Sequence, residues 1–160
     1  MKVLFLCTAN SCRSILSEAV FNQLAPSGMR AFSAGSEPRG EVNPLTIAAL
    51  QRNGFSTAGL ASKSIESLSE LQPDVVITVC DNAAGDACPV FFGRAIRAHW
   101  GLADPSEIRA SDEAVLRAFD ETLAIIEART TAFLALPLEQ LEADALQHEL
   151  ARIGALRDQS

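Results

Sequence analysis

An apolar run that passes directly into a turn and then a helix opens this chain, and it restricts the fold more than any other feature. Residues 1–6 (MKVLFL) are predicted to form a buried strand. Residues 14–25 (SILSEAVFNQLA) are predicted to form a helix with one apolar face. The turn between them exposes backbone N–H groups and the positive end of a helix dipole, which together favour a bound anion.

This turn carries a cysteine and an arginine with five residues between them, followed by a serine (CTANSCRS, residues 7–14). The field at a helix N-terminus lowers the pKa of a thiol, so Cys7 is predicted to be an ionised nucleophile. Arg13 can direct two N–H donors at a tetrahedral oxyanion, and Ser14 can donate a hydrogen bond to the Cys7 sulfur. The alternative is that Cys7 is a buried core cysteine at a strand end.

Composition fits one globular domain, because the chain has 160 residues of which 48% are hydrophobic and 21% are charged. A net charge of −7 argues against nucleic acid as the main partner. No apolar run approaches the ~20 residues that span a bilayer, and no signal peptide is apparent, so we expect a cytoplasmic protein without a membrane partner. The four cysteines are then expected to serve redox chemistry or metal binding.

From its first residue the chain is predicted to follow the order strand–helix–strand–helix–strand–strand–helix. Further strands are predicted at 29–35, 74–80 and 94–100, and further helices at 44–52, 111–136 and 138–157. This order implies an open α/β sheet with helices on both faces, in which ligands bind at the carboxyl ends of the strands. Cys7 and Cys80 both end predicted central strands, so two thiols are expected near one crevice.

These motifs resemble those of thiol-dependent arsenate reductases built on the low-molecular-weight protein tyrosine phosphatase fold. The resemblance covers about residues 1–136 and rests on CTANSCRS at 7–14, SAGS at 33–36, VVITVC at 75–80, Cys-Pro at 88–89 and HWGLADPS at 99–106. It implies a four-stranded parallel sheet in strand order 2-1-3-4. We therefore expect a reductase domain over residues 1–137 and a C-terminal helical extension of the same domain over 138–160.

The resemblance further implies a relay of three cysteines. Cys7 attacks arsenate, and Asp104 of the Asp-Pro pair protonates the leaving oxygen. Cys80 then attacks the Cys7 sulfur and releases arsenite. Cys88 attacks Cys80, and the resulting disulfide is reduced by thioredoxin or a glutaredoxin-type reductant, as thiol–disulfide exchange allows. Asp104 also has an alternative interpretation as a loop or capping residue before Pro105.

The substrate implied is arsenate, with phosphate as a competing anion. Phosphatases of this fold place aromatic residues just after the Asp-Pro pair, whereas Ser106 follows here and the chain has no tyrosine. The predicted substrate-binding residues are Thr8, Ala9, Asn10, Ser11, Cys12 and Arg13. No cofactor is expected, and a metal site is disfavoured because the chain has no C-x2-C pair and its two histidines lack zinc-type spacing.

Some relatives hold a potassium ion beside this loop through an Asn, a Glu, a Ser and an Asp. Asn10, Glu18 and Ser33 match three of these positions, and the fourth falls near Lys63. We hypothesise that the Lys63 ammonium takes the place of the cation and supports the loop through Asn10 and Glu18. The alternative is a solvated Lys63 side chain.

Two other functions stay open from the sequence. One is a low-molecular-weight protein phosphatase whose loop cysteines protect Cys7 from oxidation. The other is a redox-sensing or scaffold protein that binds an oxyanion without turning it over. Arsenate turnover that depends on Cys80 and Cys88 would separate reduction from both.

Overall fold

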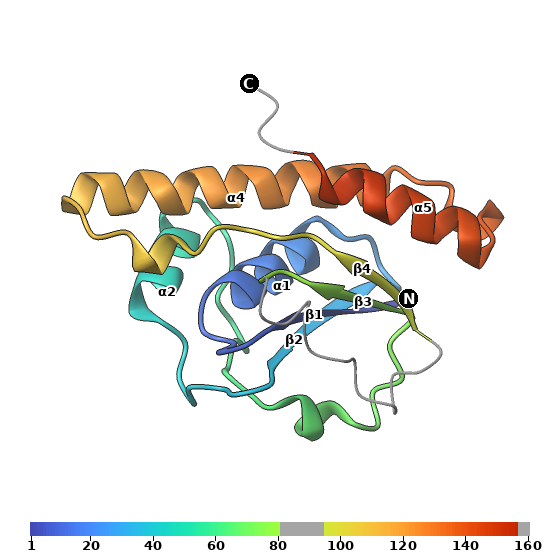
Figure 1. The fold of residues 1–160 in the computed structure, drawn as a ribbon, viewed down its shortest axis with the longest axis horizontal. Helices are drawn as coiled ribbons and strands as arrows, with labels where there is room; N and C mark the ends of the chain where they lie inside the picture. Colours follow the sequence, from blue (N-terminus) through green and yellow to red (C-terminus); the bar gives the residue numbers. More distant parts are fainter. Residues whose placement is uncertain (81–94, 157–160) are drawn as a thin grey trace.

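Four parallel strands form the centre of the molecule, in the predicted order β2-β1-β3-β4 (Figure 1). They are β1 (Lys2–Cys7), β2 (Arg30–Gly35), β3 (Val75–Thr78) and β4 (Ile96–His99). The computed structural model describes residues 1–80 and 95–156. Because β1 pairs with both β2 and β3, its C-terminal residue Cys7 lies at the middle of the sheet edge where ligands bind in such folds.

Helical segments lie on both faces of the sheet, but among the described residues the α-helices lie on one face and a 3-10 turn lies on the other. The helical segments are α1 (Arg13–Leu24), α2 (Pro44–Arg52), η1 (Ile65–Leu68), η3 (Pro105–Glu107), α4 (Asp112–Leu134), η4 (Leu138–Gln140) and α5 (Ala143–Gly154). Helices α1, α2, α4 and α5 contribute to one apolar core, and the short turn η1 covers the smaller cluster on the opposite face (Figure 1).

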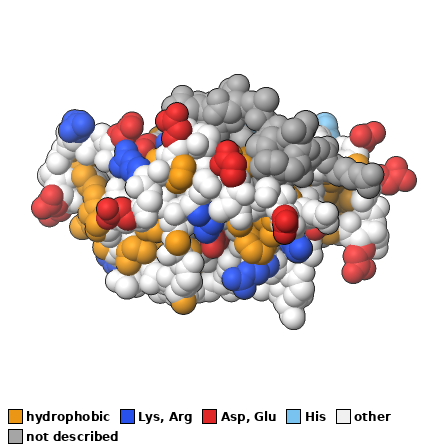
Figure 2. Space-filling model, turned by 90° about the horizontal axis from the view of Figure 1, so that it is seen from below, with side chains coloured by type: hydrophobic (Ala, Val, Ile, Leu, Met, Phe, Trp, Pro, Cys, Tyr) orange, Lys and Arg blue, Asp and Glu red, His pale blue; other side chains and the backbone are white. Residues whose placement is uncertain are grey.

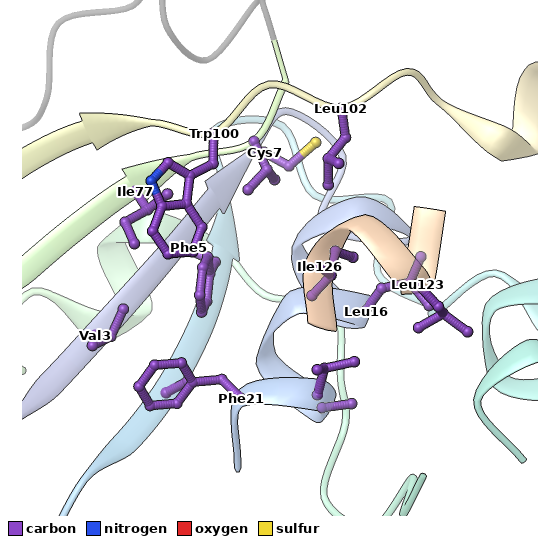
Figure 3. Packing of buried hydrophobic residues seen from close by; sticks show 14 of the residues in the cluster. Val3, Phe5, Cys7, Leu16, Phe21, Ile77, Trp100, Leu102, Leu123 and Ile126 are labelled. Atoms are coloured by element: carbon purple, nitrogen blue, oxygen red, sulfur yellow. The ribbon is translucent and has the colours of Figure 1, made fainter. Parts of the chain in front are cut away.

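An aromatic cluster fixes the strands against the helices on the larger face. Ring centroids of Phe5 and Trp100 lie 6.2 Å apart (Figure 3), and those of Phe21 and Phe133 lie 5.6 Å apart. All four rings are buried, and removing one such side chain typically costs about 3–5 kcal/mol. The cluster therefore holds β1, α1, α4 and the residue that follows β4 in one rigid unit.

The single helix predicted over residues 138–157 is wrong. The chain forms the 3-10 turn η4, becomes extended at Leu141 and Glu142, and starts α5 only at Ala143. Extended backbone at these two residues is incompatible with a continuous helix. The apolar face of α5, formed by Leu146, Leu150 and Ile153, joins the main core, so this helix packs on its own domain.

Acidic and basic side chains are interspersed on the face shown in Figure 2. Within residues 1–80 and 95–156, no helix has both the length and the apolar character needed to cross a membrane.

Candidate active site

The turn between β1 and α1 forms a loop in which three carbonyl groups are anchored to the segment that follows β2. Thr8 O accepts from Glu37 N at 2.9 Å, Ala9 O accepts from Arg39 N at 3.0 Å, and Ser11 O accepts from Asn43 N at 3.0 Å. None of the hydrogen bonds among the described residues uses the backbone N–H groups of residues 9–12. These donors are therefore left for a bound anion, as expected for a loop before a helix N-terminus.

Gly35, at the end of β2, allows a close approach that any other residue would prevent. A Cβ atom at this position would lie 2.5 Å from the carbonyl oxygen of Thr8. Asn10 supports the loop from within: its φ of 46° is left-handed, its Nδ2 donates to Ser14 Oγ at 2.8 Å, and its Oδ1 accepts from Lys63 N at 2.8 Å. Asparagine tolerates this conformation better than most residues do.

Two contacts with the segment that follows β4 hold the Arg13 guanidinium. Its Nη1 donates to the carbonyl oxygen of Leu102 at 3.0 Å, and its Nη2 lies 3.5 Å from Asp104 Oδ2. Its Nε is buried and has no hydrogen-bond partner in the described part of the chain. A buried donor without an acceptor is unfavourable, so this guanidinium is suited to accept an oxyanion as its partner.

Asp104 both caps a turn and faces Arg13. Its Oδ1 accepts from Ser106 N at 2.9 Å and from Ser106 Oγ at 2.6 Å, which caps η3. Its Oδ2 is left facing Arg13. The capping role and the position beside the anion loop therefore coexist, and Ser106 fixes which oxygen faces the loop.

Two cysteine sulfurs meet beside the loop. Cys7 is the last residue of β1, and Cys80 follows the end of β3; both are buried. A hydrogen bond joins the two thiols. The backbone N–H of Thr8 donates to Cys80 Sγ at 3.3 Å, and Thr8 Oγ1 lies 3.6 Å from the same sulfur. The structure thus brings together the two thiols that the sequence placed at neighbouring strand ends.

The prediction that Cys7 is ionised is corrected by the structure, in which the pKa of this thiol is raised. The hydrogen bond with Cys80 is the main cause, burial is the second, and the charge of Arg13 acts in the opposite direction. The helix-terminal field is outweighed because a second sulfur shares the site. The Ser14 hydroxyl accepts from Asn10 Nδ2, which leaves its own hydrogen to donate, so the hydrogen bond from Ser14 to Cys7 stays a prediction.

Cys12, which was predicted to bind substrate, has its side chain in the apolar core, so only its backbone N–H is left to contact an anion. Burial raises its pKa to about 12, while a hydrogen bond with Thr46 acts in the opposite direction. Cys88 lies outside the described residues, so its position relative to Cys80 stays a prediction.

Glu18, Ser33 and Lys63 form a cluster next to Asn10, which accepts from Lys63 N. Lys63 Nζ donates to Ser33 O at 3.1 Å and lies 4.0 Å from Glu18 Oε1, while Ser33 Oγ donates to that same carboxylate oxygen. Burial raises the pKa of Glu18, and Ser33 and Lys63 act in the opposite direction. No cluster of three His, Cys, Asp or Glu side chains able to hold a metal ion occurs within residues 1–80 and 95–156.

Sequence reasoning missed three contributors to this site. Leu102 contributes through its backbone carbonyl group, which every residue has, so its residue type does not reveal this role. Ser106 follows the common pattern of a capping aspartate and a donor two residues later, so it could have been found. Gly35 stands within the SAGS motif, but its close contact with Thr8 appears only in three dimensions.

Comparison with known proteins finds one matching protein family and similar proteins of known activity. The profile of the low molecular weight phosphotyrosine protein phosphatase family matches residues 2–148. An arsenate reductase of Bacillus subtilis is 35% identical over 111 residues, which is 69% of this chain and 78% of that protein.

Two solved structures of arsenate reductases have a similar fold. An arsenate reductase in an oxidized state is 27% identical with a TM-score of 0.69, covering 84% of this chain and 96% of that one. A thioredoxin-dependent arsenate reductase from Corynebacterium glutamicum is 28% identical with a TM-score of 0.56, covering 76% of this chain and 57% of that one.

Proposed function

Because this chain belongs to the low molecular weight phosphotyrosine protein phosphatase family, we propose that it uses the family's anion loop to reduce arsenate to arsenite. The contact between Cys7 and Cys80 carries this proposal. Phosphate ester hydrolysis needs one nucleophilic sulfur, whereas reduction by thiols needs a second sulfur that can attack the first. The arsenate reductases among its relatives support the same assignment.

The reaction balances with two thiols. The Cys7 sulfur displaces an oxygen of arsenate and forms an S–As bond, while Asp104 protonates the oxygen, which leaves as water. Arg13 and the loop N–H groups hold the remaining oxygens. Cys80 then attacks the Cys7 sulfur; the electron pair of the S–As bond passes to arsenic, which leaves as arsenite, and a Cys7–Cys80 disulfide forms.

Because the pKa of Cys7 is raised, the substrate itself is proposed to accept the proton of this thiol. A neutral thiol with an arsenate dianion carries the same total charge as a thiolate with the monoanion. The dianion can therefore take the Cys7 proton on entering the loop, where Arg13 and the N–H groups stabilise the negative charge. Phosphate shares this shape and charge and is the expected competitor.

Regeneration requires Cys88 and an external dithiol. Cys88 attacks Cys80, and thioredoxin or a glutaredoxin-type protein reduces the resulting disulfide. The thioredoxin-dependent relative favours thioredoxin. A relay of this kind needs a compartment that keeps thiols reduced, so we assign the protein to the cytoplasm.

Steady arsenate turnover with a defined reductant tests the proposed function. We expect many arsenite molecules per protein with thioredoxin, thioredoxin reductase and NADPH, and at least about tenfold slower turnover with glutathione and glutaredoxin. Comparable turnover with glutaredoxin would reassign the donor. Aryl phosphate hydrolysis without arsenite production from either system would contradict the reductase and favour the phosphatase.

We also propose that Lys63 supports the anion loop in place of a bound cation. Its ammonium group contacts the Ser33 carbonyl and faces Glu18, and its backbone N–H holds Asn10. These contacts connect the ammonium to the residue that shapes the loop. A resident positive charge would make an additional potassium ion at this place unfavourable.

Lys63→Met is expected to lower the free energy of unfolding by about 1–3 kcal/mol, because it leaves Glu18 partly buried without its cation. Thermal unfolding of the unaltered protein should be the same in KCl and NaCl of equal ionic strength. Lys2→Met, which removes the other lysine from an exposed position, is the matched control. Strong and potassium-specific stabilisation of the unaltered protein would rule out the substitution of lysine for the cation.

A further inference from the structure

Arg129 is a charged side chain inside the core, away from the anion loop. It lies in α4 with 2% of its surface exposed. Its Nη1 donates to the carbonyl oxygens of Trp100 at 2.9 Å and Gly101 at 3.2 Å, and its Nε donates to that of Leu156 at 3.0 Å. One guanidinium group therefore ties the segment that follows β4 to the residues that follow α5.

Helix α5 holds the same segment directly. Trp100 Nε1 donates to the carbonyl oxygen of Leu150 at 2.9 Å in a buried contact. Gly154 packs so closely that a Cβ atom there would lie 2.6 Å from the carbonyl oxygen of His99 and 2.8 Å from Trp100 Cδ1. The backbone from His99 to Gly101 is thus fixed by α4 and α5 together.

The residue that follows this clamped segment carries the acceptor of Arg13. Leu102 O receives Arg13 Nη1 at 3.0 Å, and Asp104 follows two residues later. Figure 3 shows Cys7 between Trp100 and Leu102, so the segment passes beside the reacting sulfur. One residue spans at most ~3.6 Å, so a displacement of Gly101 is passed on to the Leu102 carbonyl.

We propose that Arg129 is a positioning residue for Arg13, and that α5 supports the active site through Arg129 and Trp100. By holding the Leu102 carbonyl in place, the clamp fixes one edge of the Arg13 guanidinium. The buried Nε of the same guanidinium has no partner among the described residues and is therefore available to an oxyanion. The inference rests on the proposed function only in taking Arg13 as the ligand of the oxyanion.

Binding of inorganic phosphate to the full chain, measured by calorimetry well below the unfolding temperature, tests this proposal. Arg129→Lys keeps the charge but loses the planar set of donors that reaches three carbonyl groups. We expect about tenfold weaker phosphate binding and a similar rise in the arsenate KM, since a displacement of about 1 Å can cost 10²-fold at a site of this kind. Trp100→Phe, which removes only the indole donor, should weaken phosphate binding about threefold.

Two controls separate positioning from stability. Leu146→Ala removes a buried α5 side chain and should lower the unfolding temperature while leaving the phosphate Kd within twofold. Arg152→Lys alters an exposed arginine of α5 and should change neither quantity.

A double substitution tests the route through Arg13. Adding Arg129→Lys to Arg13→Lys should weaken phosphate binding less than twofold further, because the two residues act on one contact. The proposal is overturned if Arg129→Lys and Trp100→Phe bind phosphate as the unaltered protein does, or if the Arg129→Lys effect is undiminished beside Arg13→Lys. Failure of the proposed function would appear differently, as phosphate binding without arsenite production.

Discussion

Replacing Cys80 with serine is expected to lower the rate of arsenate turnover by a factor on the order of 10³ or more, while aryl phosphate hydrolysis continues. In this variant Cys7 still forms a bond to arsenic. The Cys80 sulfur that would attack the Cys7 sulfur and form a disulfide with it is missing. The contact between the Cys7 and Cys80 sulfurs makes this loss specific to reduction. Arsenite release and nitrophenol release from the same preparation measure the two activities.

The same substitution is expected to make Cys7 more reactive toward alkylation. The hydrogen bond with Cys80 is the largest cause that raises the pKa of Cys7. A hydroxyl is not ionised and is a poorer partner for a thiol, so the Cys7 pKa should fall and its thiolate fraction at a given pH should rise. Alkylation by iodoacetamide should therefore begin at lower pH in Cys80→Ser. Unchanged alkylation together with normal arsenite production would mean that Cys80 does not act on Cys7.

Asp104→Asn is expected to slow aryl phosphate hydrolysis about 10²-fold and to tighten phosphate binding about threefold. The first effect follows from the loss of the proton donor. The second follows because Asp104 Oδ2 lies 3.5 Å from Arg13 and competes with an incoming anion for that charge. Stopped-flow hydrolysis and calorimetry measure the two effects separately.

Glu107→Gln is the matched control for Asp104→Asn. It removes the same charge from the same turn, at an exposed position without a contact to Arg13. It should leave both the hydrolysis rate and the phosphate Kd within twofold. If Asp104→Asn lowers the rate no more than Glu107→Gln does, Asp104 is only the cap of η3.

The fold was predictable because its strongest signals are local. The run at residues 1–6 and the β-branched run at 74–80 are typical of buried strands, and Asn43-Pro44 marks the start of α2, where Asn43 Oδ1 accepts from Leu45 N. The C-terminal helix was predicted too long because an extended break at Leu141 and Glu142 carries no glycine or proline. Such a break is imposed by packing rather than by local preference.

The composition of the site was predictable, whereas its electrostatics were not. Strand-to-helix spacing is sufficient to place Cys7 and Arg13 in one loop. The sign of the Cys7 pKa shift depends on where Cys80 lies, and that position is set by the pairing of β1 with β3 across more than seventy residues. The contacts of Arg129 were missed for the same reason, since backbone carbonyl groups are not encoded in residue types.

Mapping the first disulfide tests most directly whether Cys80 reduces the arsenic bound to Cys7. The Cys88→Ser protein, treated with excess arsenate and no external reductant, should release one arsenite per chain. Peptide mass spectrometry should then find Cys7 joined to Cys80. A Cys7–Cys12 disulfide, or arsenite release with Cys80 still alkylatable, would contradict this account.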